Sequence, residues 1–186
     1  MAPTLADALR DWRDFYLLIG TASATLVGLM FVAASIGASL FSEKYLAPMR
    51  AFITPPVVHF GAILFVAMVS VMPGHSETSL GTILGLGALA GLAYSARIFA
   101  LIFRRFAATL DWGDRAFYAL IPVVGYLLLL ASAATELARR PIEANRLAAA
   151  ALVVLMAASL RNAWDMTVWL TSRTPTGATP PRPEGG

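Results

Sequence analysis

Five long runs of apolar residues, separated by short polar stretches, dominate this chain. The runs cover residues 15–40, 53–72, 80–103, 116–134 and 147–170. Each holds roughly 19 to 26 residues, and a helix needs about 20 residues to cross the hydrocarbon core of a bilayer. Inside lipid every backbone N–H and C=O must be paired internally, so runs of this length can only be helices. The pattern predicts an all-α integral membrane protein, built as a bundle of about five transmembrane helices.

A shorter periodic segment precedes the first run. Residues 3–14 place Leu5, Leu9 and Trp12 at helical spacing, and Thr4 stands where an N-cap is expected. Because one face is apolar and the other charged, we expect a short helix that lies at the membrane interface. This helix would lead directly into the first transmembrane span.

Prolines and glycines suggest where the helices begin, bend and end. Thr54 and Pro55 open the second run, so we expect a helix that starts there with proline at its first position. Pro122 lies inside the fourth run and removes a backbone donor, which predicts a mild kink one turn earlier. The C-terminal residues are rich in proline, glycine and threonine. We therefore expect one transmembrane domain over residues 1–172 and a disordered tail over 173–186.

Composition and charge narrow the class of protein. Apolar residues make up 58% of the chain and charged residues 13%, whereas soluble domains carry about 25% charged residues. The net charge of +3 comes from arginines at the ends of the runs, where they anchor helices and face headgroups. No basic face with interleaved aromatic residues is present, so we expect the bilayer, and no nucleic acid, as a partner.

The distribution of basic residues predicts an orientation. The side that carries the N-terminus receives five of them, and the opposite side receives seven: Lys44, Arg50, Arg104, Arg105, Arg115, Arg173 and Arg182. Since cytoplasmic loops carry the excess of lysine and arginine, this favours an N-out, C-in protein. We expect it in a bacterial inner membrane.

Small residues spaced four apart mark two of the runs. They are Gly20, Ala24 and Gly28 in the first run, and Gly87, Gly91 and Ser95 in the third. Such spacing lets helix backbones approach closely in lipid. The contacts could form between two copies of the chain or inside one bundle, and we favour packing inside one bundle.

Polar side chains inside the runs give the candidate binding site. Burying such side chains in lipid is unfavourable, so those that are present often have a function. Judged by their distance along each run, they gather in the half of the membrane opposite the N-terminus. They are His59, Tyr94, Arg97, Arg161, Asn162 and Asp165. Arg161 and Asp165 are four residues apart and share a helix face. We expect Asp165 to be the counter-ion of both arginines.

The charge of this set suggests what it binds. Two arginines and one aspartate leave an excess positive charge, which suits an anionic lipid headgroup or a small anion. A plainer interpretation is that Arg97 extends to the headgroups, that Arg161 and Asp165 form a structural ion pair, and that His59 packs between helices. A proton or ion pathway would also need polar groups in the other half, where the runs offer few.

Enzyme classes find little support. The two histidines, His59 and His75, fall on opposite sides, so they do not form a haem ligand pair. No convergent set of metal ligands and no GxSxG motif is present. We therefore expect a non-enzymatic protein without a cofactor or metal, acting as an accessory or interaction subunit that holds an anionic lipid. The alternative is a small homo-oligomeric channel or transporter subunit, assembled through the glycine faces of the first and third runs.

Overall fold

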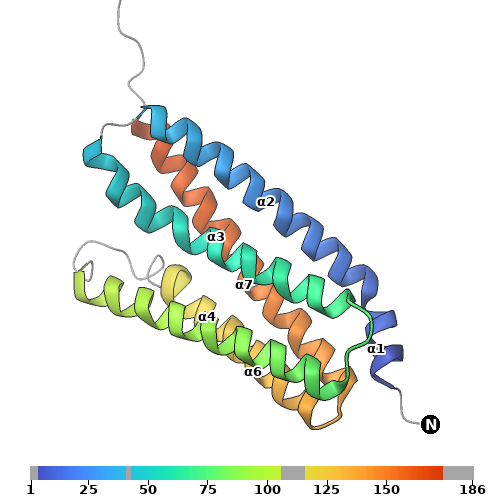
Figure 1. The fold of residues 1–186 in the computed structure, drawn as a ribbon. Coiled ribbons are helices and arrows are strands. Elements are labelled where there is room, and N and C mark those ends of the chain that lie inside the picture. The colour runs from blue at the N-terminus through green and yellow to red at the C-terminus, as the bar shows by residue number, and fades with distance from the viewer. Residues whose placement is uncertain (1–3, 41–42, 106–115, 174–186) are drawn as a thin grey trace, which may run out of the picture.

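The computed structural model describes residues 4–40, 43–105 and 116–173, and the secondary structure of these segments is helical (Figure 1). The helices are α1 (Leu5–Asp11), α2 (Arg13–Leu40), α3 (Glu43–Val71), α4 (Glu77–Arg105), the π-helical turn η1 (Ala116–Leu120), α6 (Ile121–Leu137) and α7 (Pro141–Arg173). Five spans within them are long and apolar enough to cross a membrane. The all-α class and the five candidate spans are confirmed. The predicted disordered tail lies outside the described residues, apart from Arg173.

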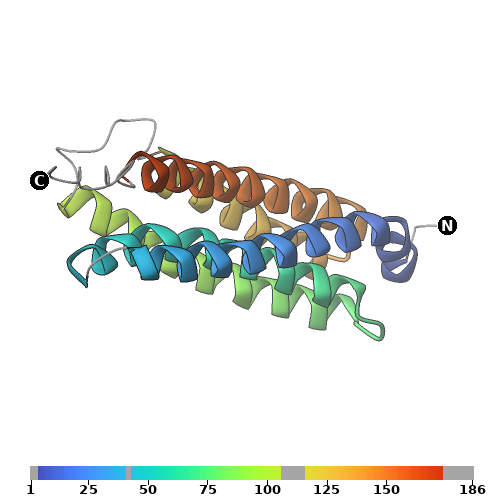
Figure 2. The same ribbon diagram turned by 90° about the horizontal axis from the view of Figure 1, so that it is seen from above.

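Consecutive long helices run antiparallel, up and down the bundle (Figures 1 and 2). α3 packs on α2 and α7, and α6 packs on α7 and α4. The start of α2, the α3–α4 turn and the α6–α7 turn therefore meet at one end of the bundle, beside α1 (Figure 2). We call this the near end. The opposite end, where α4 and α7 finish, is the far end.

Apolar side chains fill the interior and also cover the outside. Phe60, Ile63, Leu152 and Leu155 are fully buried between the helices. Large apolar side chains are also exposed on each of the five long helices, including Leu18 on α2 at 72%. A soluble bundle of this size would present polar residues on its outer faces. An apolar exterior is compatible with a polytopic membrane protein, in which lipid covers these side chains.

The N-terminal helix forms where it was predicted. Thr4 caps α1 through a capping box, in which Thr4 Oγ1 accepts from the Asp7 amide and the Asp7 carboxylate accepts from the Thr4 amide. Leu5 and Ala8 are buried, and Leu9 packs against the main core. α1 is therefore docked on the near end of the bundle through its apolar face.

The prediction that the second helix starts at Thr54 is wrong. α3 begins at Glu43 and continues through Pro55 and Pro56, both of which are buried. Proline inside a helix removes a ladder hydrogen bond, but neighbouring helices can stabilise the segment in a packed bundle. The irregularity expected before Pro122 takes the form of η1, whose wider π turn ends just before α6.

A three-residue turn joins α6 to α7. The Arg139 amide donates to the Glu136 carbonyl at 2.9 Å, and the Arg140 amide donates to the Thr135 carbonyl at 3.0 Å. Arg139 adopts a left-handed conformation with φ of 58°, a position that usually favours glycine at a helix C-terminus. Its side chain pairs with Glu77 of α4 at 3.6 Å. The turn holds α6 and α7 as a tight antiparallel hairpin.

The small residues lie mostly at contacts within the chain. A Cβ at Gly20 would come within 2.9 Å of Ala67 Cβ, and one at Gly91 would overlap the Tyr126 ring. Gly87 lies 3.7 Å from Phe65 by the same measure, and Ser95 is buried. Gly28 differs, because no atom lies within 4 Å of its Cβ position. The close approaches of Gly20 and Gly91 therefore serve packing inside one bundle.

Candidate functional site

The expected ion pair near the far end is present. Arg161 Nε lies 3.4 Å from Asp165 Oδ2, and the two side chains are 40% and 35% exposed. The Arg161 guanidinium carbon also lies 4.2 Å from the centre of the Phe117 ring, a cation–π distance. Arg161 is thus held by a carboxylate and an aromatic face at once.

Asn162 has a specific structural task beside this pair. Its Nδ2 donates to the Phe117 carbonyl at 3.2 Å, and Tyr118 Oη donates to the Asn162 carbonyl at 3.3 Å. Phe117 is five residues before Pro122. In a π turn the carbonyl of residue i accepts a hydrogen bond from the amide of residue i+5. Because Pro122 has no N–H, the Asn162 side chain supplies the missing hydrogen. Asn162 therefore joins α7 to η1.

Arg97 does not join this group. Its side chain is exposed on α4, and the adjacent Ile98 packs against Tyr118 of η1. α4 and α7 both contact η1, so η1 separates the helix that carries Arg97 from the helix that carries Arg161. The expected single pocket, in which both arginines share Asp165, is corrected to a local Arg161–Asp165 pair and a separate surface arginine.

His59 lies in the middle of the bundle with two tyrosines. His59 Nδ1 and the Tyr126 hydroxyl share a hydrogen bond of 2.9 Å, and both residues are almost fully buried. The Tyr94 and His59 rings are arranged edge to face, with ring centres 6.0 Å apart. Tyr126 is nine residues beyond Phe117, or roughly 13 Å along the helix. His59 and Tyr94 therefore belong to a different layer from Arg161, Asn162 and Asp165.

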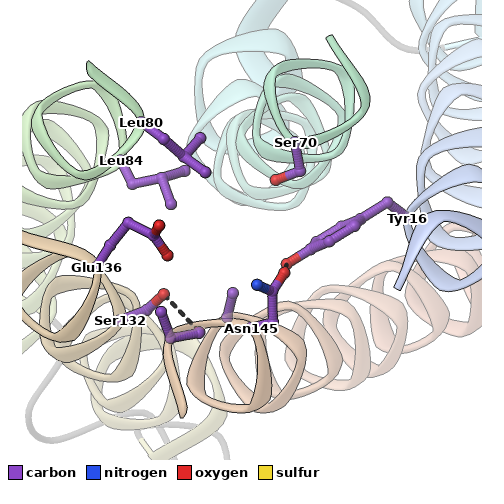
Figure 3. Close-up of a pocket in the computed structure, with 9 residues that line it drawn as sticks. Tyr16, Ser70, Leu80, Leu84, Ser132, Glu136 and Asn145 are labelled. Atoms are coloured by element: carbon purple, nitrogen blue, oxygen red, sulfur yellow. Dashed lines mark hydrogen bonds between the residues drawn. The ribbon is translucent and has the colours of Figure 1, made fainter. Parts of the chain in front are cut away.

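A third polar group, which the sequence interpretation missed, lies near the opposite end (Figure 3). It consists of side chains from four helices: Tyr16 of α2, Ser70 of α3, Ser132 and Glu136 of α6, and Asn145 of α7. Leu80 and Leu84 of α4 line the same space. We call these five polar residues the Glu136 cluster. Glu136 is 1% exposed, although it is one residue from the end of α6.

Hydrogen bonds within the cluster point away from the carboxyl group. Tyr16 Oη donates to Asn145 Oδ1 at 2.7 Å, and Asn145 Nδ2 donates to the Pro141 carbonyl at 2.8 Å. Ser132 Oγ donates to the Ala144 carbonyl at 2.7 Å. Glu136 Oε1 is buried and has no hydrogen-bond partner among the described residues. Because the hydroxyl hydrogens of Tyr16 and Ser132 are used in these bonds, both hydroxyl groups can act toward the carboxyl group only as acceptors.

A groove of about 300 Å³ opens beside this cluster, between α1 and the α3–α4 turn. We call it the near-end groove. Its apolar lining comes from both sides, and its polar lining includes two arginines and a histidine: Leu5, Ala6, Leu9, Arg10, Arg13, Ser70, Val71, Met72, Pro73, Gly74 and His75. Arg10 is paired with Asp7 at 3.1 Å, on the exposed side of α1. Ser70 lines both the groove and the Glu136 cluster.

The expectation that the near half holds few buried polar groups is therefore corrected. The apolar runs ended at residue 134 and resumed at 147, which placed Glu136 and Asn145 in a loop. One signal was available, because Ser132 and Glu136 are four apart and share a helix face. The cluster remains separated from the His59 layer by buried Ile63, Leu129 and Leu152.

The described residues offer no three His, Cys, Asp or Glu side chains that converge as metal ligands. Comparisons with protein-family models, with curated proteins and with solved structures found no match.

Proposed function

We propose that this chain is a non-enzymatic, multi-pass membrane protein that binds an anionic lipid headgroup in the near-end groove, as an accessory or interaction subunit. The observation that carries the proposal is the groove itself. It combines apolar walls with the cationic side chains of Arg10 and Arg13 and with His75, at the end of a bundle whose exterior is apolar. That is the level at which lipid headgroups meet a transmembrane bundle.

The groove suits the two chemical parts of a phospholipid. A guanidinium group binds phosphate oxygens with two parallel hydrogen bonds, and Arg13 is exposed at the start of α2. Leu5, Val71 and Met72 offer apolar surface for the first part of an acyl chain. Asp7 pairs with Arg10 at 3.1 Å, so Arg13 is the primary phosphate contact and Arg10 the second.

The far end is a weaker candidate for the same ligand. Arg161 already has Asp165 at 3.4 Å and the Phe117 ring beneath it, so its charge is largely compensated. Arg97 is exposed on a separate surface of α4. The near-end groove, by contrast, places two guanidinium groups beside apolar walls.

Lipids that copurify with the protein distinguish the two ends. The test variant is Arg10→Gln with Arg13→Gln, and the matched control is Arg97→Gln with Arg161→Gln. Each basic residue near a membrane surface contributes about 1 kcal/mol to binding anionic lipid, so the test variant should bind roughly 30-fold more weakly. Native mass spectrometry with added phosphatidylglycerol measures this. Unchanged binding by the test variant, or loss confined to the control variant, would refute the groove assignment.

A small homo-oligomeric channel or transporter subunit is the second candidate. Buried polar groups on both sides of the bundle centre favour it, namely the Glu136 cluster near one end and Asn162 toward the other. The apolar layer around Ile63 and Leu129 opposes it in this conformation, as does the use of Gly91 for packing against Tyr126. Ion flux in liposomes from an oligomeric wild-type protein would support this function, and a monomer without flux would remove it.

The membrane and the orientation are part of the proposal. The excess of basic residues at the far end favours a bacterial inner membrane with the near end facing outward. Reporter fusions at the turn after Val71 and after Arg173 test this. Reporter activity on the same side at both positions would contradict the five-span topology as well as the orientation.

A further inference from the structure

We propose that Glu136 is a proton-binding site that exchanges with the near-end face of the membrane only. This inference is independent of the lipid proposal, because it rests on the buried carboxyl group and not on the arginines of the groove. Its first support is the set of hydrogen-bond donors and acceptors around the carboxyl group. An ionised carboxylate only accepts hydrogen bonds, and Glu136 Oε1 is buried without a donor in the described part of the chain. A protonated carboxyl group instead brings a hydrogen into a site rich in acceptors.

The charged residues around Glu136 also favour the protonated form of its carboxyl group. On α4, Glu77 is engaged with Arg139, whose side chain is largely exposed. At the start of α7, Glu143 pairs with Arg140 at 2.9 Å, and both are also exposed.

The remaining helices bring little positive charge that could balance an ionised Glu136. α2 contributes the neutral Tyr16, with Arg13 and Asp14 exposed beyond it, and α3 contributes Ser70 but no titratable residue between His59 and its end. Arg146 of α7 is exposed as well, and no arginine among the described residues forms an ion pair with Glu136. A buried and unpaired carboxylate is strongly unfavourable, whereas the neutral acid is tolerated.

The size of the site selects a proton over a metal ion. The side chains of the Glu136 cluster leave no room for a water molecule between them, and a hydrated cation needs more space than one water. Loss of the proton would create a carboxylate that requires water. The cluster must then open to admit water. Figure 3 shows that the Glu136 side chain extends from α6 into the space that Ser70 and Tyr16 also line.

The route for the proton follows from Ser70. This side chain lines both the cluster and the near-end groove, so water in the groove lies one side chain away from the carboxyl group. Toward the far end, Ile63, Leu129 and Leu152 block the way. Beyond Ser132, the next buried polar side chain on α6 is Tyr126, which lies six residues, or roughly 9 Å, further along the helix. The site is therefore one-sided.

Infrared difference spectroscopy and thermal unfolding test the assignment in detergent-solubilised protein. The variant Glu136→Gln mimics the neutral acid, and Glu143→Gln is the matched control, because the Glu143 side chain is 44% exposed at the same end. At neutral pH the wild type and the control should show the carbonyl band of a protonated carboxyl group, and Glu136→Gln should lack it. Absence of this band in the wild type overturns the proposal, whether or not the variant folds.

Stability provides the second measurement. If the folded state holds the proton, the wild type must lose stability as pH rises, since the unfolded state releases it more readily. Glu136→Gln should remove this pH dependence, and Glu143→Gln should keep it. The same measurement with added salt distinguishes a sodium ion from a proton as the ligand. If sodium chloride, but not choline chloride, restores wild-type stability at high pH, the site binds sodium and the proton assignment is wrong.

Discussion

Replacing Gly91 with alanine tests the packing in the middle of the bundle. A Cβ at Gly91 would lie 2.5 Å from Tyr126 Cζ and closer still to two other ring atoms, so the ring must move. Tyr126 is almost fully buried and shares its hydroxyl with His59 at 2.9 Å. The substitution should therefore disturb both the packing of α4 on α6 and this hydrogen bond.

The expected loss combines two effects. Overpacking a well-packed core destabilises by about 1–3 kcal/mol, and leaving a buried hydrogen-bonding group unpaired costs about 1–3 kcal/mol. Alanine offsets up to about 1 kcal/mol of this loss, because its helix propensity is higher than that of glycine. Gly91→Ala should thus lower the free energy of unfolding by roughly 1–5 kcal/mol.

Unfolding in mixed micelles with increasing sodium dodecyl sulfate measures this free energy. Gly28→Ala is the control, because no atom lies within 4 Å of its Cβ position. It should be neutral or stabilise by up to about 1 kcal/mol. In the double variant Gly91→Ala, Tyr126→Ala the overlap is absent, so the two effects should not add. Equal stability of the Gly91 and Gly28 variants, or strict additivity in the double variant, would refute the reasoning.

Two further predictions concern the ends of the bundle. Arg161→Ala should destabilise the protein more than Asp165→Ala, because it removes both the ion pair and the contact with Phe117; thermal unfolding in detergent decides, and the reverse order would contradict the geometry. Hydrogen bonds from Thr4 lower the pKa of Asp7 below its ordinary value of 3.8. Protonation therefore removes a stabilising interaction as pH falls, so the protection factors of the α1 amides, which compare the measured with the intrinsic exchange rate, should decrease in acid, and Asp7→Asn should abolish this change.

The number and position of the helices were predictable because the hydrophobic requirement of a membrane span is strong and local. The helix ends were less predictable. α3 begins at Glu43, well before its apolar run, and α7 begins at Pro141, ahead of residue 147. Hydropathy reports which residues avoid water, whereas helical geometry continues through polar residues as long as backbone hydrogen bonds are made.

Among the polar sites, contacts between residues close in sequence were predictable, and contacts made by tertiary packing were not. Arg161 and Asp165 are neighbours on one helix face, so their pairing could be inferred from spacing alone. The bond between His59 and Tyr126 joins residues 67 positions apart, and no local pattern encodes it. Glu136 was overlooked because its burial depends on four other helices. Partners brought together by tertiary packing leave little trace in one sequence.

The tight hairpin of α6 and α7 has a consequence for how the protein enters a bilayer. Alone, α6 would expose the Glu136 side chain to lipid, and α7 would expose the Asn145 amide, each at an energetic penalty. Together they already shield these groups in part, since Ser132 of α6 donates to the Ala144 carbonyl of α7 across a turn of only residues 138–140. The two helices should therefore leave the insertion machinery as one unit, with the first three spans providing the surfaces that complete the shielding.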